Sequence, residues 1–164
     1  MSSSRPDTAA TNRDVDSWGN CFEFIQAREA TTYDNLLLDG RISNANVRTD
    51  DGWSGLHWIP WIGRNYKGID TDMLLYYLLT CDPPADVNGR NRWGRTPMWC
   101  AAYCNNTSAV KVLIDFGGDR TIKSNSNTSN TDANMTPLHI AKYLNFYPNQ
   151  EIIHLLTECF PSEE

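Results

Sequence analysis

Histidine and cysteine are the residues of this chain whose chemistry would first suggest a metal site or a catalytic centre. The 164 residues include three His and five Cys. Cys100 and Cys104 lie four residues apart in a predicted short helix, so the two thiols would share one helix face. A zinc site needs further ligands at suitable spacing, and neither Cys81 nor Cys159 provides them. We expect no metal site and expect these cysteines to fill space in a core.

His57 and His139 are the candidates for acid–base catalysis. Each stands at the same place in a short motif that recurs along the chain, and Trp99 fills that place in the copy between them. A structural role is therefore favoured for both, and His154 is expected on the surface of the last helix. The sequence contains no nucleophile elbow, phosphate-binding loop or paired-carboxylate pattern. We expect neither enzymatic activity nor a cofactor.

Aromatic side chains are the more informative set. The chain has six Trp, and Trp, Tyr and Arg are the residues most enriched at the energetic centres of protein interfaces. Trp53 and Trp93 each lie beside a glycine at a predicted turn, where a large side chain would be accessible. The alternative is that some of these rings fill space in the core, and for Trp58 that alternative is preferred.

Residues 91–121 contain the most regular of the elements that would position these side chains. They begin with a tight turn, after which Thr96 is placed to cap a helix over residues 98–104. Asn105 and Asn106 break that helix, because asparagine tolerates the left-handed conformation of a helix end. A second helix is predicted over residues 108–116, with its apolar residues on one face.

A turn followed by two short antiparallel helices cannot bury its own apolar faces, so such a unit should recur. Residues 135–141 repeat the pattern of residues 95–101, and residues 53–59 are a more degraded copy. These residues resemble the ankyrin repeat, whose Thr-Pro-Leu-His signature is intact at positions 136–139. The triplet at positions 86–88 matches the link of that family into the next turn. The resemblance implies an all-α fold, a short helical solenoid of about three repeats with hairpin-like turns and a degraded N-terminal cap.

The repeat register sets the predicted domain boundaries. Asn46 precedes Ser54 by eight residues, as Asn88 precedes Thr96, so a degraded cap is expected before the first full unit. The predicted segments are a disordered tail at 1–17, a cap at 18–49, repeats at 50–90, 91–130 and 131–160, and a short tail at 161–164.

Two irregular stretches interrupt this pattern. Pro60 falls inside the first helix of the first unit, where it removes a backbone hydrogen bond, so that helix is expected to kink or shorten. Residues 122–133 are an extra run rich in Ser, Asn and Thr between the second and third units. We expect this run to form a mobile extension of a turn.

The resemblance also implies where a partner would bind. In ankyrin-like stacks, partners usually meet the turn tips and the exposed side of the first helix of each unit. These positions lie four, three and one residue before the Thr of the motif and seven or eight residues after it. The residues predicted to form a concave binding face are Trp53, Trp61, Arg92, Trp93, Arg95, Tyr103, Met135 and Tyr143.

Composition narrows the remaining possibilities. The formal net charge of −6 opposes a general binder of nucleic-acid phosphates. No run of 18 apolar residues and no signal-like apolar segment is present, so a membrane span or secretion is not expected. Five cysteines without framework spacing suit a reducing compartment. We expect a monomer in the cytoplasm or nucleus.

The leading functional hypothesis is a non-catalytic protein–protein interaction module with an aromatic and arginine-rich face. The alternative is a small inhibitor or regulatory subunit that blocks the functional surface of an enzyme or transcription factor. A nucleic-acid binder is a third hypothesis, which the acidic charge opposes. The identity of the partner does not follow from the repeats, because the same scaffold carries many different surfaces.

Overall fold

The computed structural model describes residues 45–46, 48–65, 70–126 and 131–158. The predicted tails and the predicted cap up to residue 44 lie outside these residues. The described part is all-α, as predicted, with one isolated β-bridge between Arg48 and Ser54 and no strand. Its helices are α3 (Gly55–Asn65), α4 (Thr71–Thr80), α5 (Pro97–Tyr103), α6 (Thr107–Asp115), α7 (Pro137–Tyr143) and α8 (Gln150–Thr157).

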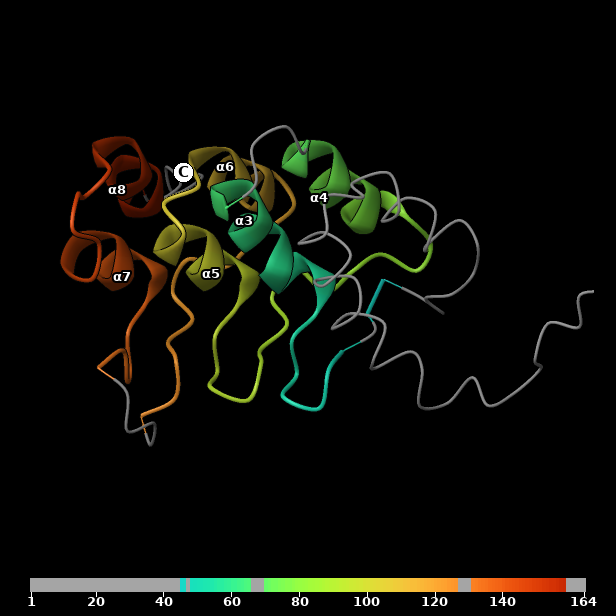
Figure 1. Ribbon diagram of the computed structural model, residues 1–164, viewed down its shortest axis with the longest axis horizontal. Coiled ribbons are helices and arrows are strands. Elements are labelled where there is room, and N and C mark those ends of the chain that lie inside the picture. The colour runs from blue at the N-terminus through green and yellow to red at the C-terminus, as the bar shows by residue number, and fades with distance from the viewer. Residues whose placement is uncertain (1–44, 47, 66–69, 127–130, 159–164) are drawn as a thin grey trace, which may run out of the picture.

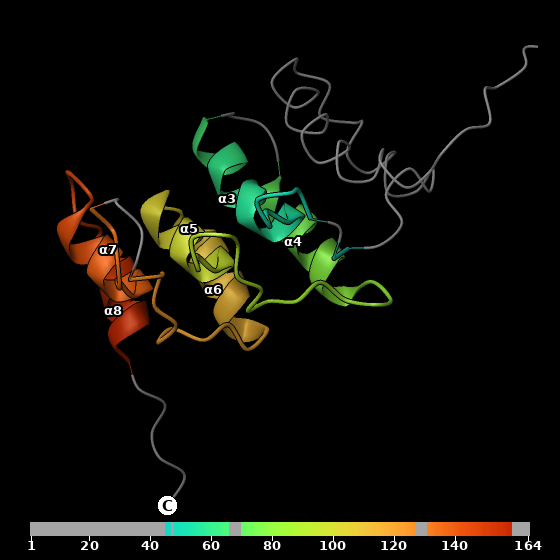
Figure 2. The same cartoon turned by 90° about the horizontal axis from the view of Figure 1, so that it is seen from below.

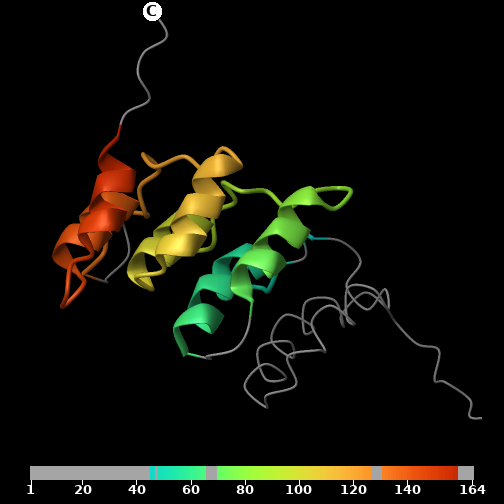
Figure 3. The same cartoon turned by 90° about the horizontal axis from the view of Figure 1, so that it is seen from above.

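The helices form two layers. Helices α3, α5 and α7 make one row and α4, α6 and α8 the other, with the turns extending from the ends of the first row (Figure 1). Each helix contacts the next helix of its own row, and α3, α5 and α7 contact α4, α6 and α8 respectively. Figures 2 and 3 show the three pairs stacked side by side. This arrangement is the predicted short solenoid.

Threonine caps determine where the first helices of the second and third units begin. The Thr96 side chain accepts a hydrogen bond from the Trp99 N–H at 3.2 Å, and Thr136 accepts one from the His139 N–H at 3.3 Å. A proline follows each cap, at the position where its missing N–H costs nothing. Helix α5 consequently spans Pro97–Tyr103, one residue earlier than predicted.

Asparagines separate α5 from α6. Asn105 adopts a left-handed conformation with φ of 58°, which ends α5. The side chain of Asn106 then accepts a hydrogen bond from the Ala109 N–H at 3.0 Å and caps α6. Because of this cap, α6 spans Thr107–Asp115 instead of the predicted residues 108–116.

In each turn, the residue two positions before Ser54, Thr96 or Thr136 has a left-handed backbone conformation. Gly52, Gly94 and Asn134 have φ values of 79°, 73° and 57°. Glycine adopts this conformation without steric cost, and asparagine adopts it more easily than other residues with a side chain. Each predicted hairpin-like turn therefore depends on a glycine or an asparagine two residues before Ser54, Thr96 or Thr136.

Neighbouring turns are hydrogen-bonded to one another through the backbone. The Arg92 N–H donates to the Asp51 carbonyl at 2.8 Å, and the Asn125 N–H donates to the Trp93 carbonyl at 2.9 Å. The three turns therefore form a connected edge along the stack, to which the turn side chains are attached.

Two asparagines link consecutive units through their side-chain amides. The amides of Asn46 and Asn88 each bond one carbonyl and one N–H further along the chain. These partners are Pro84 and Asp86 for Asn46, and Gly117 and Asp119 for Asn88. The equal spacing of Asn46 and Asn88 from the helices that follow predicts that the two residues are equivalent, and their matching bonds confirm this.

Pro60 was expected to kink or shorten its helix, and the expected shortening is wrong. Helix α3 continues through Pro60 to Asn65 and, at 11 residues, is the longest of the described helices. Leu56, Ile59 and Ile62 lie on both sides of the proline and are fully buried. Burial of three such side chains contributes roughly 1.5–3 kcal/mol each, which outweighs the cost of about 3 kcal/mol for a proline in a helix.

The described residues of the extra run 122–133 are held in place by hydrogen bonds and by burial. Ser124 and Asp132 are both buried, at 3% and 4% exposure. The Ser124 N–H donates to the Met135 carbonyl at 3.0 Å, and the Ser124 hydroxyl donates to the Asp132 carbonyl. The ends of the predicted mobile extension are thus fixed by polar contacts, which its composition did not suggest. Residues 127–130 lie outside the described residues.

The core runs between the two layers through all three units. Its largest fully buried apolar side chains come from α3 to α8 and are Leu56, Ile59, Ile62, Leu75, Leu78, Met98, Val110, Leu113, Ile140 and Ile152. The cysteines Cys100 and Cys104 are buried in the same core region, as the sequence predicts.

Candidate functional site

Two positions of the repeat are equivalent in all three units and belong to the predicted binding face. They are the residue just before the helix cap and the residue seven positions after that cap. We call this set the inner-face residues: Trp53, Trp61, Arg95, Tyr103, Met135 and Tyr143. Four of them, from the first two units, lie around one hollow.

The hollow has a volume of about 390 Å³. It is bounded by side chains of all three units: Trp53, Trp61, Arg95, Trp99, Tyr103, Thr131, Asp132 and Leu144. No single repeat could form it, because its walls come from α3, α5 and the residues on both sides of α7.

Arg95 is the charged group at the centre of this site. Its Nε and Nη2 atoms each lie 2.9 Å from Oδ2 of Asp132. The guanidinium carbon lies 4.5 Å from the ring centroid of Trp99 and 5.7 Å from that of Trp93. The Arg95 and Asp132 side chains are only 19% and 6% exposed, so this ion pair is shielded from water on most sides. The pair fixes the guanidinium against the aromatic wall.

A row of three rings forms the aromatic wall. Trp99 stacks on Tyr103 with ring centroids 5.4 Å apart and an interplanar angle of 10°. Tyr103 in turn contacts Trp61 of α3 at 5.6 Å. Trp99 was not among the predicted binding residues. The available signal was its place in the motif, where Trp replaces the histidine found at positions 57 and 139.

The tryptophans of the turns do not project freely from the tips, contrary to the sequence-based expectation. Trp53 and Trp93 are both half-buried, and their ring centroids lie 5.9 Å apart. Trp53 also stacks on Trp58 of α3 at 4.7 Å. The backbone bonds between neighbouring turns bring these rings close enough to cover one another.

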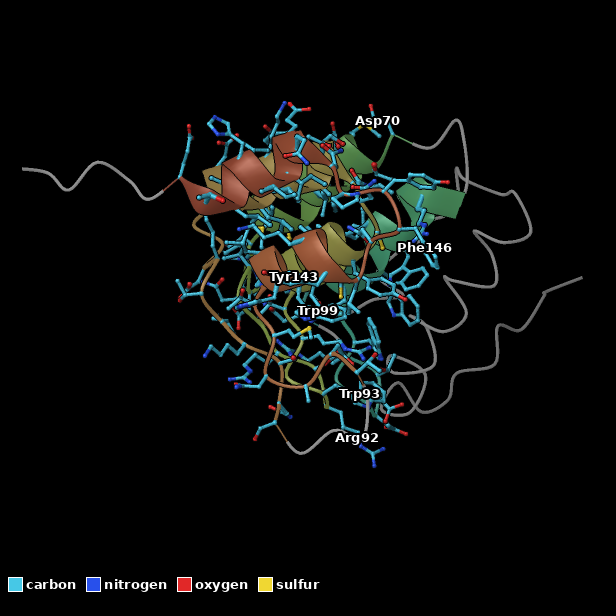
Figure 4. All side chains as sticks on the ribbon, turned by 90° about the vertical axis from the view of Figure 1, so that its left-hand side faces the viewer. Asp70, Arg92, Trp93, Trp99, Tyr143 and Phe146 are labelled. Carbon is cyan, nitrogen blue, oxygen red and sulfur yellow. The ribbon has the colours of Figure 1, made fainter. Side chains whose placement is uncertain are left out.

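The other predicted binding residues lie away from the hollow. Arg92 is exposed at a turn tip and pairs with Asp51, the Arg92 Nη1 atom lying 3.1 Å from Oδ1 of the aspartate. Figure 4 shows Arg92 and Trp93 on the turns, below Trp99 and Tyr143 on the helices. Tyr143 is 71% exposed on α7, and Met135 is half-buried beside the core.

Two exposed aromatic residues were missed by the sequence analysis. Phe146 and Tyr147 are 98% and 87% exposed in the loop between α7 and α8. The motif gave no signal for them, because the loop between paired helices lies outside the binding positions of the family pattern.

The histidines have the structural role that the motif predicts. The Ser54 N–H donates to Nδ1 of His57 at 3.1 Å, so the proton lies on Nε2, which donates to the Arg95 carbonyl at 3.0 Å. Burial lowers the pKa of His57 from 6.5 to about 4. At the equivalent position, Nδ1 of His139 lies 2.7 Å from the Thr136 hydroxyl, and His139 is exposed.

The described residues include individual side chains that could bind a metal or act as nucleophiles. They contain no group of three or more His, Cys, Asp or Glu that could hold a metal ion. Burial raises the pKa of the Cys104 thiol to about 12 and that of Cys100 well above its ordinary value, so neither is a ready nucleophile. Within the same residues, no helix is long and apolar enough to cross a membrane.

Comparison with known proteins agrees with the geometry. A family model described as ankyrin repeats (3 copies) matches residues 66–162, more than half of the chain. A protein of Rickettsia bellii (strain RML369-C), whose name contains the words ankyrin repeat protein, is 33% identical over 75 residues. That match covers 46% of this chain and 39% of the relative, so the chain spans well under half of the relative's length.

Proposed function

We propose that this chain, which belongs to the ankyrin repeat family, binds a protein partner through the face formed by its turns and the inner-face residues. Ankyrin repeats are generally protein–protein interaction modules and are typically non-catalytic. The residues proposed to contact the partner are Trp53, Trp61, Arg92, Trp93, Arg95, Tyr103, Met135 and Tyr143.

The aromatic hollow is the observation that supports this proposal. Interface hot spots are enriched in Trp, Tyr and Arg and lie in well-packed pockets near the centre of a binding surface. The hollow brings Trp61, Arg95, Trp99 and Tyr103 together and is bounded by all three units. Its rings contact one another, so they lose little conformational freedom when a partner binds.

The second row of helices, α4, α6 and α8, is called the outer layer here. It offers another exposed surface with which the proposed binding face can be compared. Met73 and Tyr76 of α4 are 52% and 44% exposed. Tyr76 contacts the ring of Phe116 edge-on at 5.5 Å, and neither residue borders the hollow. A partner that used the outer layer would therefore be contacted by Tyr76 and not by Tyr143.

Site-specific crosslinking in the source cell tests the proposal. A benzophenone amino acid would replace Tyr143 on the inner side in one variant and Tyr76 on the outer side in a matched variant. We expect illumination to give a defined crosslinked protein with the first variant and a much weaker product with the second. Strong crosslinking at Tyr76 alone, or none at either position, would contradict a partner on the inner side.

The crosslinked partner also allows the two roles considered from the sequence to be separated. Its own activity would be measured with and without a stoichiometric amount of this chain. Loss of that activity would identify an inhibitor, and unchanged activity would identify an adaptor.

A further inference from the structure

We infer that the hollow receives one large apolar side chain, preferably aromatic, from an acidic peptide segment of the partner, and that Arg64 contacts a carboxylate of that segment. This inference rests on the proposed binding function and specifies the chemistry of the ligand. It follows from the size of the hollow, from the charges inside it and from the charge at its edge.

The size of the hollow limits what can enter. At about 390 Å³ it lies near the lower end of the range of roughly 300–1,000 Å³ found for ligand pockets. Its walls combine the rings of Trp53, Trp61 and Tyr103 with polar groups, which suits a side chain that is aromatic and not purely aliphatic. A single large side chain fits such a space, whereas a helix, with a diameter of about 10 Å or more, does not.

The charges inside the hollow oppose a cationic ligand. The face of Trp99 that would attract a cation is already covered by the Arg95 guanidinium at 4.5 Å. Asp132, the only carboxylate among the lining residues, is already paired with Arg95 at 2.9 Å. A lysine or arginine side chain from a partner would meet a fixed guanidinium without a free carboxylate to offset the repulsion.

Arg95 also has hydrogen-bonding capacity left over. Its bonds to Asp132 use Nε and Nη2, and within the described residues the N–H groups of Nη1 have no hydrogen-bond acceptor. A guanidinium has five N–H donors, so a peptide carbonyl or carboxylate at the hollow could accept from Nη1. An acceptor-bearing ligand is therefore favoured over one that only donates.

Arg64 places a positive charge next to one of the residues that line the hollow. Arg64, near the end of α3, is exposed, and its Nη1 atom lies 3.5 Å from the carbonyl of Tyr103, a lining residue. No carboxylate of the described residues pairs with Arg64. A carboxylate that follows the inserted side chain by a few residues could reach this guanidinium.

The acidic character of the whole chain does not reverse this local preference. The formal net charge is −6, but at physiological ionic strength charges are largely screened beyond about 8 Å. A carboxylate of the bound segment that contacts Arg64 lies well within this screening distance. We therefore expect the local positive charge to set the preference for the bound segment.

A peptide library gives an unbiased test. Random 12-residue peptides displayed on phage would be selected on the full chain, and enriched peptides would be synthesised with a fluorescent label for anisotropy titrations. We expect enriched sequences to have an aromatic residue with Asp or Glu within a few positions and a negative net charge. Enrichment of Lys- and Arg-rich peptides, or no enrichment at all, would overturn the inference.

Matched charge variants test the role of Arg64. Arg64→Gln and Lys111→Gln each remove one exposed positive charge, but Lys111 lies on α6 in the outer layer, where it pairs with Glu151. We expect the first change to weaken peptide binding about fivefold and the second to change it less than twofold. Equal effects of the two variants would overturn the contact with Arg64.

Variants of the hollow and of the peptide test the insertion of a side chain. Alanine in place of the peptide's aromatic residue should weaken binding about tenfold or more. Trp61→Ala should weaken it comparably, provided that its circular-dichroism spectrum matches that of the original chain. If alanine in the peptide has no effect, the hollow is not the site of insertion. If crosslinking at Tyr143 succeeds while peptide selection fails, the inference falls and the binding function stands.

Discussion

Arg95 links all three repeats through two different parts of one residue. Its carbonyl accepts the Nε2–H of His57 from the first unit at 3.0 Å. Its side chain pairs with Asp132, which precedes the helices of the third unit, at 2.9 Å. Arg95, which lies just before the cap of α5, therefore both holds the repeats together and belongs to the proposed binding site. Such a residue is poorly suited to a test by mutation, because its loss would change stability and binding together.

His57 should make stability depend on pH. Burial lowers its pKa from 6.5 to about 4, so the folded chain holds it neutral while the unfolded chain protonates it near pH 6.5. Its contribution is fully present above pH 6.5 and is lost as the pH falls from there toward 4. We expect a loss of roughly 2–3 kcal/mol in the free energy of unfolding between pH 7.5 and pH 4.5.

Urea titrations at both pH values would measure this loss. His57→Gln should show a smaller drop than the original chain by that amount, although it is less stable at neutral pH. The matched control is His139→Gln, which removes an exposed histidine from the equivalent position. If His57→Gln and the original chain lose the same stability on acidification, His57 is not the group responsible.

At the scale of elements, short helices are made stable by caps at their ends and by burial between layers. Helices α5 and α7 have seven residues each, too few to be stable alone. Thr96 and Thr136 satisfy their first free N–H groups, and both helices pack against neighbours on two sides. The same balance explains α3, in which buried residues outweigh the effect of Pro60.

Leu113 of α6 provides the clearest test of this layer packing. It is fully buried between the two layers, so Leu113→Ala leaves a cavity and should lower the free energy of unfolding by roughly 2–5 kcal/mol. Urea denaturation followed by far-ultraviolet circular dichroism would measure the change. Asp115→Ala, at an exposed position of the same helix, is the control and should change stability by less than about 0.5 kcal/mol. A cost for Leu113→Ala as small as that of the control would be inconsistent with the packing described.

At the scale of the whole molecule, the site and the charge are properties of the complete stack. The hollow exists because side chains of three units converge on it, and the turns are joined into one edge by backbone hydrogen bonds. The chain as a whole is acidic, with a formal net charge of −6. This net charge bears on binding to nucleic acid, whose phosphates are also negative.

We expect the chain not to bind duplex DNA at physiological salt. General binding to nucleic acid requires cations that displace the counterions of the phosphates, and this chain has a net negative charge. Anisotropy of a labelled duplex of about 20 base pairs, titrated with the chain at about 0.15 M salt, would measure it. Saturable binding that weakens steeply as salt is raised would contradict this expectation and revive the nucleic-acid hypothesis.

The sequence by itself determined the repeat and its register. The caps at Thr96 and Thr136 and the left-handed Gly94 act within four residues of the chain, so their spacing alone predicts a turn and the start of a helix. The eight-residue spacing from Asn88 to Thr96 likewise identified Asn46 as the equivalent of Asn88, and the structure added that both side chains bridge consecutive units. Helix ends were displaced by one residue where a proline or an asparagine cap marked the boundary.

Only the tertiary structure decided which side chains meet between units. Arg95 and Asp132 are 37 residues apart in the chain, and their 2.9 Å contact depends on how the second and third units stack. The same stacking turned Trp53 and Trp93 toward each other and placed Trp99 on the wall of the hollow. A local pattern specifies the face on which a residue lies. Which residue of the next repeat it contacts is set by the distance and angle between helices, and these depend on every side chain packed between them.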